Sequence, residues 1–209
     1  IFFLFRSGLV GEDGATHHGV FDIAYLRCIP NMIIYAPMNE IALRNILYTA
    51  QLGLNHPIAI RYPRGRGITV DWQKPFEVIE IGIGKCLKQG TKTAVISSGT
   101  IGNNVIEAFS KMENTDAFAH YDFAFVKPLD EKLLHLIFNT YQSIITIEDG
   151  AIKGGFGSAI VEFSKEHDYT TPIKTLGIPD QFIEHGSIAE LQKLCGIDME
   201  SLMVVLKNA

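Results

Sequence analysis

Residues 6–19 read Arg6-Ser7-Gly8-Leu9-Val10-Gly11-Glu12-Asp13-Gly14-Ala15-Thr16-His17-His18-Gly19 and form the densest group of reactive side chains in the sequence. They follow an apolar run, residues 1–5, and precede an amphipathic segment that starts near Phe21. Glycine lets a backbone turn sharply and approach a ligand closely. Loops at the carboxyl ends of parallel strands are where open α/β folds bind ligands. The pattern therefore predicts a strand, a ligand-binding glycine-rich loop (residues 8–19) and a helix.

Around this loop, short apolar runs alternate with amphipathic stretches as far as residue 66, and we call this part the first block. Strands are expected at residues 1–5, 32–36 and 58–62, the first of them buried. The first helix should bury one apolar face, made of Phe21, Ala24, Tyr25 and Cys28. The second helix should begin after the cap residue Asn39 and bury Leu43, Ile46, Leu47 and Ala50. Such alternation with short connections implies a parallel sheet.

The pattern lapses over residues 67–76, which predicts an ordered linker, and resumes over residues 77–209, the second block. Strands are expected there at residues 93–97, 123–126, 143–147 and 173–176. Helices should begin near Asn103, after the cap residue Asp130 and behind Gly154–Gly157. The sequence therefore predicts an α/β protein of two consecutive domains, residues 1–66 and 77–209, with mostly parallel sheets.

The composition of the chain argues against several classes of function. The net charge of −5 argues against electrostatic binding to nucleic acid or anionic lipid. No apolar run reaches the roughly 18 residues that are needed to span a bilayer. Three widely separated cysteines fit a reduced, cytoplasmic protein. The start lacks both an initiator Met and a basic leader, so we expect a core strand cut from a longer chain.

Asp13 and His17 stand four residues apart in the glycine-rich loop and could reach one small ligand if the loop folds back. The alternative is a loop of turn-forming glycines with surface histidines. A metal site made of His17, His18 and Asp13 is a third interpretation, but it lacks a ligand spacing typical of metal sites.

A second polar cluster follows the strand at residues 58–62 and contains Arg61, Arg64 and Arg66. A planar guanidinium can hold a phosphate through two parallel hydrogen bonds, whereas the alternative is three solvated arginines at a sheet edge. Three other features are predicted to be structural: the glycines at positions 154, 155 and 157 serve close helix packing, Glu148 and Asp149 point apart, and His185 is a structural or interface histidine.

Residues 11–19 resemble the substrate loop of transketolase-like thiamine-diphosphate enzymes. Within that group, four further stretches resemble the 1-deoxy-D-xylulose-5-phosphate synthase family, and together the five cover the chain in order. These four stretches are residues 25–32 (YLRCIPNM), 61–65 (RYPRG), 125–130 (FVKPLD) and 177–186 (GIPDQFIEHG).

This resemblance implies the latter half of a pyrimidine-binding domain, truncated at its N-terminus, followed by a transketolase C-terminal domain. It implies a full-length homodimeric enzyme that condenses pyruvate with glyceraldehyde 3-phosphate for isoprenoid biosynthesis, using thiamine diphosphate and Mg²⁺. Asp13 and His17 would then be catalytic, and Arg6 and Arg64 would bind the acceptor's phosphate. The cofactor-binding residues would precede Ile1 with no metal ligand in this chain, so the fragment alone should be inactive and bind no cofactor.

Phe5 departs from the family pattern, which has an acidic residue before the loop arginine, and this leaves the orientation of Arg6 open. Two alternatives also stay open. The chain could belong to transketolase itself or to a pyruvate dehydrogenase beta-like subunit. It could also be a non-catalytic dimerisation module of the same fold, since the second block has no convincing catalytic set.

Overall fold

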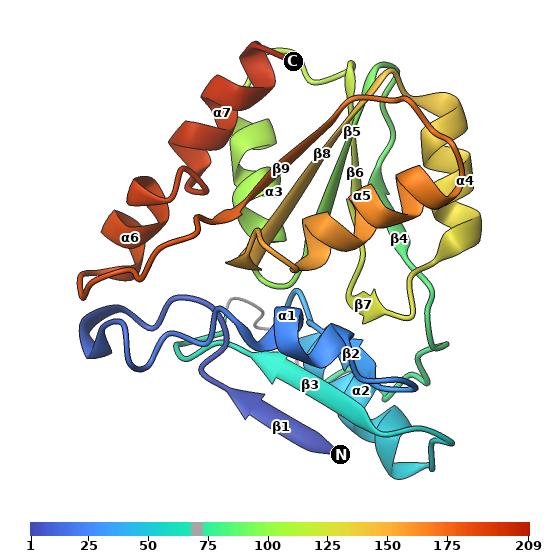
Figure 1. Cartoon of the computed structure of the whole chain (residues 1–209), viewed down its shortest axis with the longest axis vertical. Coiled ribbons are helices and arrows are strands. Elements are labelled where there is room, and N and C mark those ends of the chain that lie inside the picture. The colour runs from blue at the N-terminus through green and yellow to red at the C-terminus, as the bar shows by residue number, and fades with distance from the viewer. Residues whose placement is uncertain (68–72) are drawn as a thin grey trace.

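The computed structural model describes residues 1–67 and 73–209, which form two sheets stacked end to end with helices around them (Figure 1). The first block lies below the second in this view, and the carboxyl ends of β5 and β8 point toward it. Part of the predicted linker, residues 68–72, lies outside the described residues.

The first sheet has the order β1-β3-β2-β7. Its strands are β1 (Phe2–Phe5), β2 (Ile33–Tyr35), β3 (Ile58–Tyr62) and β7 (Phe125–Lys127). The first three are parallel, as predicted, and β7 pairs antiparallel with β2. β7 belongs to the second block but joins the sheet of the first, so the sheets do not follow the predicted boundary between the blocks. The division into domains at residues 1–66 and 77–209 stays a prediction.

The second sheet has the order β4-β6-β5-β8-β9. Its strands are β4 (Lys85–Lys88), β5 (Thr93–Ser98), β6 (Phe118–Asp122), β8 (Ser143–Ala151) and β9 (Ile173–Ile178). All neighbours are parallel except β4 and β6. The sequence prediction missed β4 and β6, and the strand that it placed at residues 123–126 overlaps only β7, just after β6 ends at Asp122. The chain leaves one sheet for the other at this point, which a local pattern does not reveal.

Seven α-helices and one short 3-10 helix surround the sheets in the described residues. They are η1 (Gly11–Asp13), α1 (Asp22–Arg27), α2 (Glu40–Gln51), α3 (Gly102–Lys111), α4 (Glu131–Thr140), α5 (Phe156–Glu166), α6 (Ile188–Leu194) and α7 (Met199–Lys207). Both predicted caps are confirmed: Asn39 accepts a hydrogen bond from the Ala42 amide, and Asp130 accepts one from Leu133. The predicted apolar face of α2 packs on β2 and β3.

The predicted buried face of the first helix is wrong. α1 buries Asp22, Ile23 and Leu26, whereas Phe21 is 41% and Tyr25 is 56% exposed. The local pattern favoured the aromatic side of the helix. The structure turns the other side inward because the Asp22 carboxylate has a buried guanidinium to bind.

The prediction that the first strand is buried is also wrong, because Phe2, Phe3 and Phe5 are 55–57% exposed. β1 lies at the edge of the described sheet and pairs only with β3. Strand pairing on one side leaves the side chains of an edge strand without neighbours on the other.

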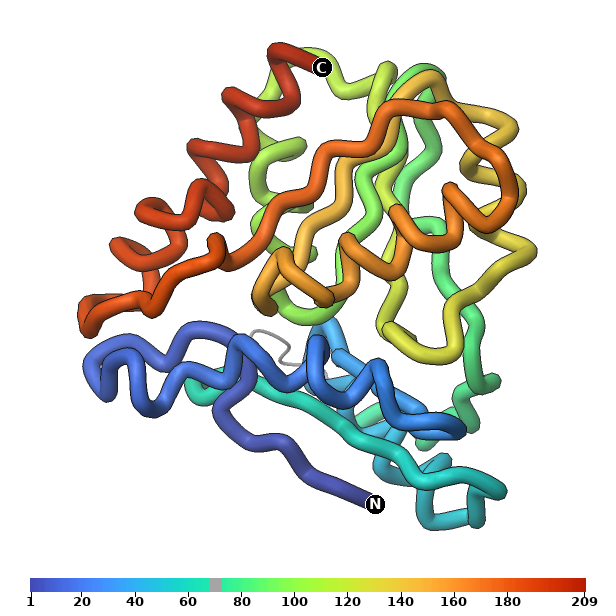
Figure 2. The backbone as a smooth tube through the Cα atoms, viewed as in Figure 1, coloured from blue at the N-terminus to red at the C-terminus, as the bar shows by residue number. Residues whose placement is uncertain are grey.

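One hydrophobic core joins the two blocks. It contains Ile23, Ile34 and Ala59 from the first block together with Ile96 and Phe156 from the second. The tube in Figure 2 shows the same arrangement, with the blue N-terminal segment running beneath the orange segment around residues 150–160. The two predicted domains are therefore packed as one unit, and polar groups between them are held in fixed positions.

Candidate functional site

The glycine-rich loop is tied at its neck by backbone hydrogen bonds. The amide of Gly8 donates to the Gly19 carbonyl at 2.8 Å, and that of Gly19 donates to the Gly8 carbonyl at 3.0 Å. Gly8 has a φ of +73°, which favours glycine. A side chain at Gly19 would collide with the Arg6 carbonyl. These two glycines therefore close the loop.

His18 shapes the loop from inside. Its Nδ1 accepts a hydrogen bond from the Val10 amide at 3.0 Å, and its Nε2 lies 3.4 Å from the Glu184 carbonyl. Since His18 is only 8% exposed, it is a structural residue. It is neither a metal ligand nor a catalyst in this arrangement.

Three of the four predicted site residues meet in the structure. Asp13 Oδ2 lies 2.6 Å from Arg64 Nη1 and 3.1 Å from Arg6 Nη1, and we call these residues the loop cluster. The side chains are 30%, 50% and 35% exposed, respectively, so an incoming ligand can reach them. Two guanidinium groups converge on one carboxylate oxygen, an arrangement chemically suited to an anion.

The fourth predicted residue, His17, is exposed and its Nδ1 lies 2.9 Å from Thr16 Oγ1. Among the described residues, its imidazole bonds none of the other three predicted site residues. It lies on the same loop as Asp13, and its partner is a surface hydroxyl, which leaves the ring free to meet a ligand.

Arg61 does not lie in the same environment as Arg64 and Arg66, the other two arginines of the cluster that the sequence suggested. It is 2% exposed, bonds Asp22 through Nε at 2.8 Å, and pairs with Asp149 at the end of β8. Burial lowers the pKa of Arg61, but the carboxylates of Asp149 and Asp22 more than offset this and leave it above its ordinary value. The interpretation of Arg61 as a ligand-binding residue is therefore wrong. We call Asp22, Arg61 and Asp149 the interface cluster.

Glu148 and Asp149 point apart, as predicted. Glu148 accepts hydrogen bonds from the Phe156 and Gly157 amides at 2.8 Å each, and so fills the N-terminus of α5. Burial raises the pKa of Glu148 to about 7, partly offset by these amides. A side chain at Gly155 or Gly157 would collide with neighbouring atoms, so these glycines serve packing and not a phosphate.

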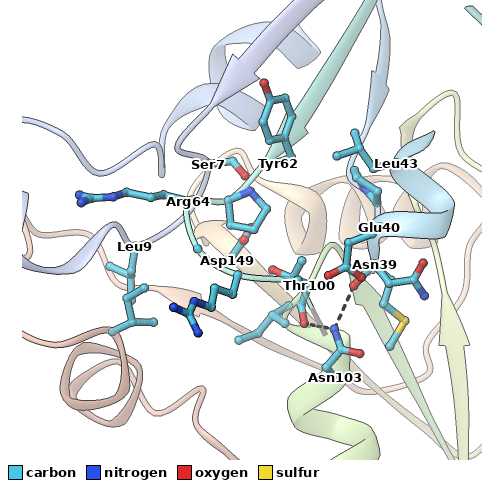
Figure 3. A pocket seen from close by; sticks show the side chains of 18 of the residues that line it. Ser7, Leu9, Asn39, Glu40, Leu43, Tyr62, Arg64, Thr100, Asn103 and Asp149 are labelled. Atoms are coloured by element: carbon cyan, nitrogen blue, oxygen red, sulfur yellow. Dashed lines mark hydrogen bonds between the residues drawn. The ribbon is translucent and has the colours of Figure 1, made fainter. Parts of the chain in front are cut away.

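A cleft of about 580 Å³ lies between the blocks, beside Arg64. Figure 3 shows Tyr62 and Leu43 from the first block on one side and Thr100 and Asn103 from the second on the other. Asn103 spans the boundary, because its amide group donates to the Met38 carbonyl at 2.9 Å. Of the loop cluster, Arg64 lines this cleft, whereas Asp13 and Arg6 do not.

Residues 1–67 and 73–209 lack two features that would indicate other classes of function. They contain no group of three or more His, Cys, Asp or Glu side chains that could hold a metal ion. None of their helices has the length and apolar character needed to cross a bilayer.

Known protein families account for most of the chain. Residues 1–67 match the transketolase pyrimidine binding domain, and residues 82–202 match the transketolase C-terminal domain. The chain belongs to the transketolase family. The two blocks of the structure therefore correspond to two domain types of that family, in the order that the resemblance implied.

Curated relatives within the transketolase family carry the name 1-deoxy-D-xylulose-5-phosphate synthase. The protein from Bacteroides thetaiotaomicron is 55% identical over 199 residues, which cover 94% of this chain and 31% of the relative. That from Parabacteroides distasonis is 55% identical over 204 residues, covering 97% and 32%. The chain thus spans about a third of the length of these relatives.

Solved structures of transketolases share the fold. A split-gene transketolase, described as an inactive beta4 tetramer, matches with a TM-score of 0.81 and 26% identity, over 99% of this chain and 65% of that one. Transketolase from Campylobacter jejuni matches with a TM-score of 0.67 and 18% identity, over 100% and 31%, which supports the fold alone.

Sequence reasoning missed the interface cluster. Asp149 did carry a signal, because it stands at the carboxyl end of a buried strand where ligands and loops gather. Asp22 carried none, since a carboxylate in the first turn of a helix is ordinary on the surface. Only the meeting of the two blocks shows that both bind Arg61.

Proposed function

We propose that this chain is the acceptor-binding part of a longer 1-deoxy-D-xylulose-5-phosphate synthase. That enzyme condenses pyruvate with glyceraldehyde 3-phosphate and releases carbon dioxide. The loop cluster carries the proposal, because two reachable guanidinium groups converge beside a carboxylate and suit the phosphate of the acceptor. The names of the curated relatives support the same reaction.

Each loop residue has a part in this proposal. Arg6 and Arg64 bind the phosphate of glyceraldehyde 3-phosphate, which holds the aldehyde in place and lowers the entropic part of the barrier. Asp13 keeps the two guanidinium groups together before the phosphate arrives, and with His17 it faces the reacting carbons in the catalytic role that the resemblance implies. His17 donates a hydrogen bond to the aldehyde oxygen as negative charge develops on it.

The family implies thiamine diphosphate, which supplies the chemistry of decarboxylation and carbon–carbon bond formation. The described residues do not fit its diphosphate–metal end. They offer no acidic cluster for Mg²⁺, and Asp13 already binds two arginines. We therefore assign thiamine diphosphate and Mg²⁺ to no residue described in this chain. We also propose that the full-length enzyme is a homodimer.

Replacing Arg64 with alanine in the full-length protein tests the phosphate role. The kcat/KM for glyceraldehyde 3-phosphate should fall by a factor that corresponds to roughly 2–4 kcal/mol, since one charged bidentate contact is lost. The KM for pyruvate should stay close to that of the unchanged enzyme, because pyruvate has no phosphate to bind.

The control is Lys111→Ala, which removes an exposed cation at the end of α3, outside the cleft, and should change neither KM. Steady-state assays that vary one substrate at a time decide the result. Equal effects on both substrates would remove Arg64 from the phosphate role. Turnover of a ketose phosphate donor in place of pyruvate would assign the protein to transketolase.

A further inference from the structure

We propose that Arg61, Asp22 and Asp149, the interface cluster, are positioning residues that hold the glycine-rich loop in its working geometry. Through Asp149, the second block becomes a necessary part of the acceptor site, although it supplies no group of the loop cluster. This inference rests on the proposed function, since the loop is the element that would bind the acceptor.

The first argument is the burial of charge. The Arg61 side chain is 1% exposed, that of Asp22 is 5% and that of Asp149 is 12%. Removing charged groups from water costs several kcal/mol per ion, which only close pairing offsets. Such a cluster has one favourable arrangement, so it fixes its three residues relative to one another.

The second argument is where the cluster attaches to the loop. Arg61 Nη2 donates to the Gly19 carbonyl at 3.2 Å, at the end of the loop. Asp149 packs on the start of the loop, because a Cβ atom built on Gly8 would lie only 2.7 Å from Asp149 Oδ2. The interface cluster thus contacts both residues of the neck: Arg61 bonds Gly19, and Asp149 packs against Gly8.

The third argument is that the second block also supports the tip of the loop. The Gly186 amide donates to the Gly11 carbonyl at 3.4 Å, and the Glu184 carbonyl faces His18. A Cβ atom on Gly14 would lie 3.4 Å from His185 Cβ. The second block therefore contacts both the neck and the tip of the loop, and the tip contacts at Gly11, Gly14 and His18 are next to Asp13 and His17 in the chain.

Burial also excludes direct catalysis by Arg61. Arg61 is 2% exposed, and four of its five N–H groups donate to Asp22, Asp149 and the Gly19 carbonyl, so its guanidinium is committed to partners inside the protein. Arg61 can therefore affect the reaction only through the position of the loop. Because the loop binds the acceptor, we expect changes in the cluster to affect glyceraldehyde 3-phosphate more than pyruvate.

Replacing Asp149 with asparagine in the full-length protein tests this inference. The variant keeps the shape of the side chain but removes one of the two charges that hold Arg61. Displacements of about 1 Å in a site can cost 10²-fold, so kcat/KM for glyceraldehyde 3-phosphate should fall about 10- to 100-fold. The KM for pyruvate should change less than about 2-fold, because the loop cluster binds only the acceptor.

The control is Glu162→Gln, which breaks the ion pair between Glu162 on α5 and Arg27 on α1. That pair also joins the two blocks, but it does not touch the loop. The variant should leave both KM values unchanged. Hydrogen exchange of residues 8–19 should be faster in Asp149→Asn than in Glu162→Gln, and this readout is independent of turnover.

Two outcomes would overturn the inference: equal losses for both substrates, or loop exchange in Asp149→Asn no faster than in the control. If Asp149→Asn does not fold, Asp149→Glu replaces it, because it keeps the charge while pushing a longer side chain against Gly8. The same selective loss is then expected, and its absence refutes the inference. If the unchanged enzyme is active and Arg64→Ala is selective, such a failure concerns the interface cluster alone and leaves the proposed function standing.

Discussion

The interface cluster and the loop cluster are built from the same chemical groups, yet they differ in every physical property that matters. Arg61 and Arg64 are three residues apart, one at the end of β3 and one just beyond it. Arg61 binds two carboxylates with 1% of its side chain exposed, whereas Arg64 shares one carboxylate with Arg6 and is 50% exposed.

The difference shows how environment assigns a role to an arginine. A buried guanidinium that loses its carboxylates leaves an uncompensated charge, so the interface cluster resists change. An exposed pair gains little from its charges, because water and salt screen them. The loop cluster can therefore exchange Asp13 for a ligand at little cost, which a binding site requires.

The largest effect should come from replacing Arg61 with methionine, which leaves the charges of Asp22 and Asp149 buried without a partner. We expect a loss of about 3–5 kcal/mol in the free energy of unfolding. Urea unfolding of the chain at neutral pH measures it. Arg64→Met is the matched control, with a loss below about 1 kcal/mol. Similar losses in the two variants would break the comparison between the clusters.

An intermediate effect should appear in Glu148→Gln, because Glu148 is as buried as Arg61 but is held by backbone amides and not by an arginine. Burial raises its pKa from 4.5 to about 7. The folded state thus binds this proton more tightly than the unfolded state. The resulting stabilisation is complete below pH 4.5 and is lost as the pH rises through 7.

The free energy of unfolding should therefore decline less between pH 5 and 7 in Glu148→Gln than in the unchanged chain, by roughly 1–3 kcal/mol. Asp122, whose pKa burial also raises to about 7, titrates in both proteins, so only their difference is informative. Glu162→Gln at an exposed site is the control. Parallel pH curves for Glu148→Gln and the unchanged chain would contradict the expectation.

The smallest effect on stability should come from Asp13→Asn, which removes the shared partner of Arg6 and Arg64. A loss of about 0.2–1 kcal/mol is expected, and it should shrink further in about 1 M salt. The buried counterpart, Asp22→Asn, should cost several times more and respond little to salt. Thermal unfolding at two salt concentrations compares them, and a large, salt-independent loss for Asp13→Asn would show that the loop cluster is structural.

Much of the fold was predictable because its signals are local. Asn39 and Asp130 cap helices through bonds to amides three residues ahead, and the strand at residues 58–62 is marked by the short apolar run Ile58–Ile60. The apolar face of α2 followed from its spacing. The family resemblance added Asp13, Arg6 and Arg64, and the structure brings these three together.

The sequence by itself determined the α/β class, most of the elements and the chemical content of the glycine-rich loop, since each depends on neighbours along the chain. Tertiary structure alone decided which side of α1 is buried, that β7 joins the first sheet, and that Arg61 is structural while Arg64 stays reachable. These outcomes depend on residues as far apart as Asp22 and Asp149, which meet only when the two blocks share one core. Burial is a property of the assembled molecule, and it is burial that separates the two arginines.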